Sequence, residues 1–236
     1  MRILSVVLFS IGLLLGVAFV GAAVWADLEA SLFDPPVGVD EPLKTLRCPV
    51  IITTQESGTV TATFSNPSTR SVPRTVRAHI SYGFATLTRE VNTQFVLEPG
   101  GTHKLEWTVT SDDAAWRHFI LTRVHVLRNS PLPSRTGSCG VLVMDLLGLT
   151  GNQIVVSSWI ASLTTMLIGV ILWAVARRSA KERMPNLTGA MVGLAAIVLV
   201  AMLASLVGWW VLGGLLLLFV LILTVSVITW AIAKAT

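Results

Sequence analysis

The sequence predicts an α+β membrane protein in which four transmembrane helices carry one extracytoplasmic antiparallel β-sandwich, inserted between helices 1 and 2. Two observations lead to this prediction. Long stretches of the chain lack charged residues, and the polar segment after the first of them shows the period-two alternation of β-strands. Only 13% of the 236 residues are charged, against about 25% in soluble domains. The composition therefore excludes an ordinary soluble protein and a disordered chain.

The first predicted helix covers residues 1–25 and contains an uncharged run from Ile3 to Trp25. At about 1.5 Å per residue, this run crosses a hydrocarbon core of about 30 Å. A cleaved signal peptide is the alternative, since Val24-Trp25-Ala26 resembles a cleavage site. Because the run is longer than the roughly 7–15 apolar residues of a signal peptide, we expect an uncleaved signal anchor.

The remaining helices follow the polar segment. Helix 2 is predicted over residues 152–176, with its apolar run from Ile154 to Ala176. Residues 187–236 are predicted to hold the last two spans, because the uncharged run from Met184 to Ala233 is about twice as long as one span needs. The sequence Gly208-Trp209-Trp210 divides this run, which predicts a hairpin of helices 3 and 4. Tryptophan prefers the membrane interface, so this turn should lie at a bilayer surface.

Basic residues next to the spans predict the orientation. Outside residues 26–151 the only acidic residue is Glu182, and the basic residues are Arg2, Arg177, Arg178, Lys181, Arg183 and Lys234. Lys and Arg concentrate in cytoplasmic loops, so residues 177–186 form a basic cytoplasmic loop and both termini are cytoplasmic. This places residues 26–151 outside a plasma or inner membrane. It also explains the high isoelectric point without a nucleic-acid partner.

Small residues recur on the predicted helices. They mark candidate packing faces at Ser157, Ala161, Thr165 and Gly169, at Gly12 and Gly16, and at Gly189 and Gly193. Small side chains let helix backbones approach closely in a membrane. Such faces serve either packing within this chain or docking of another membrane subunit. No ionisable residue lies inside a span, which counts against a proton pump or an ion-coupled carrier.

The sequence of residues 26–151 predicts a β-sandwich that is preceded by an acidic linker. The linker, Asp27–Glu41, has five acidic and no basic residues. Beyond Cys48, the pattern predicts about seven short strands separated by turns. Six of them begin near the following residues: Thr59, Thr75, Thr86, Thr102, Phe119 and Gly140. This spacing is typical of an antiparallel sandwich of immunoglobulin type.

One part of this segment resembles a known family. Three segments are similar to motifs of bacterial cell-adhesion-related Ig-like modules of the CARDB type. They are Val60-Thr61-Ala62-Thr63-Phe64-Ser65-Asn66-Pro67, Val76-Arg77-Ala78-His79-Ile80 and Leu97-Glu98-Pro99-Gly100-Gly101. The resemblance covers roughly Cys48–Leu127. It implies an Ig-like fold used for binding or spacing, with no catalytic residues to transfer.

Two cysteines bracket the predicted sandwich. Cys48 precedes its first strand and Cys139 precedes its last. An extracytoplasmic pair of this kind favours a disulfide. Two buried free thiols are the alternative, and metal binding by two cysteines so far apart ranks lower.

Catalytic motifs are absent from the sequence, which predicts no enzyme, no cofactor and no metal centre. Two matched pairs remain as a candidate surface patch, formed by Arg77, His79, Arg123 and His125. If their strands pair, this patch binds an anion or a partner more strongly below about pH 6.5. The alternative is a set of ordinary solvent-facing side chains. A histidine metal site with His103 or His118 ranks lower, and Asp112-Asp113 reads as a turn.

These observations predict a non-catalytic accessory or scaffold subunit whose Ig-like domain binds a partner within a larger membrane assembly. Its partners would be other membrane subunits and membrane lipid. The alternative is a membrane enzyme or transport component that handles a lipid or apolar substrate where the sandwich meets the bilayer, near Trp25, Trp209, Trp210 and Asp145.

Overall fold

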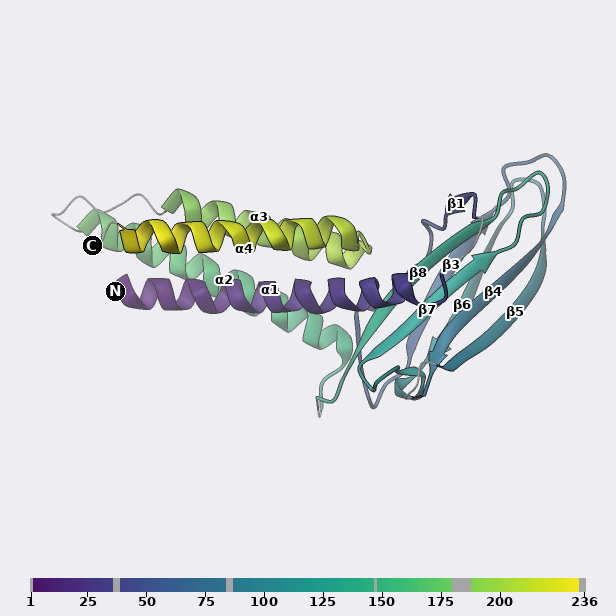
Figure 1. The fold of residues 1–236 in the computed structure, drawn as a ribbon, viewed down its shortest axis with the longest axis horizontal. Coiled ribbons are helices and arrows are strands. Elements are labelled where there is room, and N and C mark those ends of the chain that lie inside the picture. The colour runs from purple at the N-terminus through teal and green to yellow at the C-terminus, as the bar shows by residue number, and fades with distance from the viewer. Residues whose placement is uncertain (1, 36–38, 84–86, 147, 180–187, 234–236) are drawn as a thin grey trace. The chain divides into compact units, whose positions relative to one another are not determined.

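The computed structural model of the chain describes residues 2–35, 39–83, 87–146, 148–179 and 188–233. It divides into two units. Residues 1–24 and 155–236 form one, called the helical unit here, and residues 25–154 form the other, called the β domain. Each unit is described by itself (Figure 1).

The described residues form four helices, α1 (Arg2–Leu32), α2 (Gly151–Ser179), α3 (Thr188–Val207) and α4 (Trp210–Ala233). The helical unit contains α3, α4 and most of α1 and α2, whereas the end of α1 and the first turn of α2 belong to the β domain. Three of them, α1, α2 and α3, are long and apolar enough to cross a membrane. The apolar stretch found in α4 covers Trp210–Ser226 and is shorter. Gly208, with φ of +80°, and Trp209 separate α3 from α4.

Small residues bring α1 and α2 into close contact. A Cβ atom on Gly12 would lie 2.6 Å from the carbonyl oxygen of Ser162, and one on Gly169 would lie 2.8 Å from the backbone nitrogen of Phe9. The hydroxyl of Ser162 donates a hydrogen bond of 2.8 Å to the Gly12 carbonyl. Backbones can approach this closely only where side chains are small, so this face serves packing within the chain.

Some of the other predicted packing residues contact a neighbouring helix and some do not. Gly16 packs on α2 and α3, since a Cβ there would meet Val198 and Ser162. Gly189 and Gly193 on α3 face open space, with no atom of the structure within 4 Å of an added Cβ. On α2, Thr165 lies next to Gly12 of α1. Its hydroxyl donates a hydrogen bond to the carbonyl of Ala161.

The described residues of the β domain form eight strands, which are β1 (Glu41–Pro42), β2 (Ile51–Thr53), β3 (Gly58–Ser65), β4 (Val72–Tyr82), β5 (Leu87–Leu97), β6 (Thr102–Val109), β7 (Phe119–Val126) and β8 (Arg135–Met144). A 3-10 turn, Ser111–Asp113, follows β6. One sheet has the order β1-β8-β7-β4-β5, with β2 also paired to β8. The second sheet pairs β3 with β6.

The expectation of a purely antiparallel arrangement is wrong at one edge. β1 and β2 both run parallel to β8, whereas the other pairs are antiparallel. Parallel neighbours need a long connection between them. The chain supplies it here, because the strands β3 to β7 all lie between β2 and β8 in sequence.

One core lies between the two sheets. Val60 and Ala62 of β3, together with Trp107 and Val109 of β6, pack with Ile80 of β4, and buried residues of β7 and β8 complete the cluster. The alternation predicted for these strands therefore corresponds to burial: β3 alternates buried positions with exposed or half-exposed ones along its whole length. Burying this apolar surface is the main force that holds the two sheets together.

The turn that carries the family resemblance is held by Asn66, which is buried. Its side-chain amide donates to the carbonyls of Arg70 and Leu97, at 2.7 and 2.9 Å. The Asn66 carbonyl in turn accepts from the amide of Gly100, where φ is +67°. The asparagine turn and the Pro-Gly turn thus bind each other at one end of the two sheets.

The linker interpretation of Asp27–Glu41 is wrong for its first residues, because α1 continues to Leu32. Acidic residues end an apolar span, but they do not end a helix, and no glycine or proline lies between Trp25 and Pro35. The extended helix approaches β8 at Gly140, whose amide donates to the Asp27 carboxylate at 2.9 Å. A Cβ at Gly140 would collide with the carbonyl of Ala26, so glycine permits this approach.

Cys48 and Cys139 form a disulfide, with their Cα atoms 6.3 Å apart. Cys139 lies within β8 and not before it, because this strand begins at Arg135 and is longer than the sequence pattern indicated. The bond therefore joins the segment before β2 to the middle of β8.

Candidate functional site

Strand pairing brings the four residues of the predicted patch together. β4 and β7 are antiparallel neighbours, with Arg77 opposite His125 and His79 opposite Arg123. All four side chains share the face of the sheet that lies away from the core, because Val76, Ala78 and Val124 occupy the core face. Directly opposite side chains in a sheet lie close enough to interact.

The expectation of an exposed patch is wrong for Arg123, which is buried. The end of α1 covers this part of the sheet, where Ala30 packs with Ala115 and Leu121. The Arg123 guanidinium donates from Nη2 to the carbonyls of Ala30 and Ser31, at 3.1 and 2.6 Å. These are orphan carbonyls of the last helical turn, and a cation there also complements the helix dipole.

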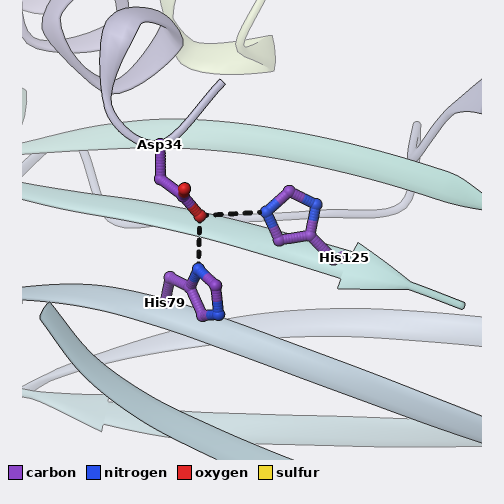
Figure 2. Close-up of side chains that lie close together, drawn as sticks. All are labelled: Asp34, His79 and His125. Carbon is purple, nitrogen blue, oxygen red and sulfur yellow. Dashed lines mark hydrogen bonds and ion pairs between the residues drawn. The ribbon is translucent and has the colours of Figure 1, made fainter. Parts of the chain in front are cut away.

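Asp34 follows this turn and completes the site. The sequence did not identify Asp34 as a member of the site. Its φ of +47° lies in the left-handed region, which aspartate tolerates better than most residues. Figure 2 shows the Asp34 carboxylate between the two imidazole rings. Its Oδ2 atom accepts a short hydrogen bond from Nδ1 of His79 and lies 3.2 Å from Nε2 of His125. The two rings meet edge to face, with centroids 5.2 Å apart.

This arrangement shifts the pKa values of Asp34 and His125. Desolvation raises the pKa of the Asp34 carboxyl, but hydrogen bonds and positive charge from His79 and His125 outweigh it and bring that pKa below the ordinary value. Burial lowers the pKa of His125, against the opposing effect of Asp34. The Asp34 carboxylate is therefore ionised at neutral pH.

The far nitrogens of the two rings have different surroundings. Nδ1 of His125 lies 3.3 Å from the hydroxyl oxygen of Thr136, which is also 3.2 Å from the Val124 carbonyl. Nε2 of His79 is buried and has no hydrogen-bond partner, and the nearest acid is Glu90, whose Oε1 lies 3.9 Å away. A buried ring nitrogen without a partner is uncommon in folded proteins and calls for an explanation.

A pocket of about 460 Å³ opens beside this cluster. Its charged lining residues are Asp34, Asp40, Arg77, Arg128 and Arg135, together with the two histidines. Arg135 binds Glu41 at 2.9 Å, and Arg77 lies 3.9 Å from Glu90. The Arg128 side chain makes no ion pair or hydrogen bond with any described residue. The pocket therefore combines arginines with nearby carboxylates, and Arg128 is the arginine of its described lining without a direct ion pair.

The other residues singled out in the sequence lie elsewhere. His103, on β6, stacks on Phe95 with ring centroids 4.2 Å apart, and His118 lies beside Phe119 before β7. Asp113 belongs to the 3-10 turn and binds Arg89 at 3.0 Å, so this acidic pair is a turn, as expected. Asp145 accepts a hydrogen bond from Thr54.

The residues used for topology are only partly described. Arg177 and Arg178 lie in the last turn of α2. Lys181, Arg183 and Lys234 fall outside the described residues. Trp25 and Trp209 are exposed, at 53% and 62%. The lipid-handling alternative, which needs these tryptophans beside Asp145, stays a prediction.

Comparisons with known proteins give partial structural similarities and no related sequence. No protein-family model matches the chain, and no curated protein matches it. Among solved structures, it is similar to a CARDB domain from Pyrococcus furiosus, with 13% identity over 42% of this chain and 84% of that chain, at a TM-score of 0.33.

Other similar structures are enzymes of which only a part is covered. A β-glucosidase from Listeria innocua has 17% identity and a TM-score of 0.31, over 42% of this chain and 15% of that chain. An alkylpurine DNA glycosylase from Pseudomonas fluorescens has 17% identity and a TM-score of 0.30, over 42% of this chain and 29% of that chain. The similarity to a CARDB domain agrees with the family that the strand and turn motifs resemble.

Proposed function

We propose that this chain is a non-catalytic integral membrane subunit whose four helices anchor it and whose Ig-like β-sandwich binds a partner protein on the extracytoplasmic side. The observation that carries the proposal is the pocket beside Asp34, where Arg77, Arg128 and Arg135 line one cavity. Such a pocket fits an acidic segment of a partner.

The helical unit supports the role of an anchor. The span interiors contain no ionisable residue, so they offer no path for a proton or an ion. α1, α2 and α3 are apolar over their membrane-length windows, and the hairpin prediction assigns α4 to a fourth span. Arg177 and Arg178 at the end of α2 fit the cytoplasmic side. The disulfide fits the oxidising, extracytoplasmic side.

The chemistry of the pocket supports binding. Among the described residues that line it, Ser134 is the hydroxyl side chain, and it donates to Asp40 at 2.8 Å instead of to a histidine. No activated nucleophile is therefore assembled in this described part of the chain. Arginine is suited to such a surface, because its planar fork binds carboxylates through two parallel hydrogen bonds.

Crosslinking in intact cells tests this proposal. A photoreactive amino acid at Arg128 should join the chain to a partner of defined mass, and the charge reversal Arg77→Glu should weaken that crosslink. A photoreactive residue at Arg70, on an exposed turn outside the pocket, is the matched control and should give no such product. The proposal fails if positions 128 and 70 crosslink alike, or if the chain purifies in mild detergent as a monomer that crosslinks to nothing.

A further inference from the structure

We infer that Asp34, His79 and His125 form a binding site for one divalent transition-metal ion, of which Zn²⁺ is the best match. The three side chains come from separate elements, namely the end of α1, β4 and β7 (Figure 2). Their ligand atoms all lie within 4.8 Å of one another. Two imidazoles and one carboxylate are a common ligand set for zinc.

The spacing of the ligand atoms suits a small ion. Zinc binds nitrogen and oxygen at about 2.0–2.2 Å, so neighbouring ligand atoms of a tetrahedral site lie about 3.3 Å apart. Oδ2 of Asp34 and Nε2 of His125 are already 3.2 Å apart. The contact between Asp34 and His79 is a direct hydrogen bond, and it has to open when an ion enters. Asp34 lies beyond the helix end with a side chain that is 42% exposed, so it has room to turn.

The unpartnered nitrogen of His79 gives independent support. Nδ1 of His79 contacts Asp34, whereas its buried Nε2 has no hydrogen-bond partner among the described residues. A metal ion on Nδ1 would move the ring proton to Nε2, where Glu90 lies 3.9 Å away as an acceptor. Histidine ligands usually donate their second nitrogen to a carboxylate or a carbonyl in this way.

His125 shows the same pattern. With a metal ion on Nε2, its Nδ1 carries the proton and donates to the Thr136 hydroxyl at 3.3 Å. That hydroxyl can then donate to the Val124 carbonyl at 3.2 Å. In this series of hydrogen bonds, each donor has one acceptor. In the absence of an ion, a neutral His125 that donates to Asp34 competes with Val124 for the single Thr136 proton.

Two nearby arginines are each engaged elsewhere. Arg77 faces Glu90, and Arg123 is held by the carbonyls of Ala30 and Ser31. Three protein ligands leave a fourth position for water or for a carboxylate of an acidic partner. The metal site stands on its own geometry and does not depend on the proposed partner.

Metal binding to the full chain in detergent micelles tests this inference. After chelation and dialysis, calorimetric titration with Zn²⁺ should give one ion per chain, and Co²⁺ should give the absorption spectrum of a four-coordinate site with nitrogen ligands. His79→Ala, His125→Ala and Asp34→Asn should each weaken binding by at least about 10-fold. Glu90→Gln, which removes the carboxylate that lies near both His79 and Arg77, should weaken it by about 10-fold while the protein stays folded.

His103→Ala is the matched control, because His103 lies on the other sheet and should leave Zn²⁺ binding unchanged. The inference is overturned if the wild-type chain binds no stoichiometric Zn²⁺, or if Asp34→Asn and His103→Ala bind it equally. Such a result would leave the crosslink at Arg128 unaffected, so the metal site and the partner site fail separately.

Discussion

The side chain of Arg123, on β7, donates a hydrogen bond of 2.6 Å to the carbonyl oxygen of Ser31 in the last turn of α1. These residues are 92 positions apart in the sequence. The contact holds the helix end on the sheet and thereby places Asp34 between His79 and His125. Arg123 is therefore a positioning residue for the candidate site.

Replacing Arg123 should release the helix end. Arg123→Leu leaves the carbonyls of Ala30 and Ser31 without their buried donor, and we expect a loss of about 2–4 kcal/mol of stability in the β domain. Denaturant unfolding and hydrogen exchange of residues 25–34 measure this effect. Arg77→Leu is the control, because its half-exposed ion pair at 3.9 Å should contribute about 1 kcal/mol or less. Equal losses for both variants would contradict the positioning role.

The core of the β domain was largely predictable from the sequence. The alternation at Val60, Ala62 and Phe64 was enough to assign the buried face of β3, because a strand repeats every two residues. The two Arg-x-His motifs, at residues 77–79 and 123–125, identified the two strands, β4 and β7, that meet beside the site. Their register, with Arg77 opposite His125, was not predictable, since it depends on pairing across the sheet.

Asp34 could not be predicted, for a physical reason. It lies 45 residues from His79 and 91 from His125, and nothing local in the sequence marks it as their partner. The acidic stretch around it looked like a linker, whereas its first residues extend α1. The one available signal was the absence of a helix breaker between Trp25 and Pro35, which allows the helix to leave the membrane and continue.

Acid should weaken the contact between Asp40 and Ser134. The backbone amide and the hydroxyl of Ser134 both donate to Asp40, and they lower the pKa of its carboxyl below 3.8, while Arg128 acts in the same direction. A lowered carboxyl pKa contributes stability that is present above the unfolded-state value and is lost as the pH falls through the folded-state value. Thermal unfolding of wild type and Asp40→Asn should therefore differ at pH 7 and converge in strong acid. A difference that persists unchanged to pH 2 would contradict this assignment.

Close packing of α1 on α2 predicts an asymmetry between two glycines. Gly12→Leu should separate the helices, because even a Cβ there would lie 2.6 Å from the Ser162 carbonyl oxygen. Overpacking of this kind costs about 1–3 kcal/mol or more. Gly193→Leu meets open space and should leave the melting temperature of the detergent-solubilised chain unchanged. Size-exclusion chromatography after heating compares the two variants, and a stable Gly12→Leu protein would rule out this packing.

The disulfide should be the strongest single contribution to the stability of the β domain. Cys48 and Cys139 are 91 residues apart, and closing so long a loop restricts the unfolded chain by about 4–5 kcal/mol. Replacing both cysteines by alanine should lower the denaturant midpoint of the β domain strongly, while the helical unit, which contains neither cysteine, keeps its own transition. Treating the wild type with a reductant should reproduce the shift. If reduction shifts the double-alanine protein as much as the wild type, the loss of stability does not come from this bond.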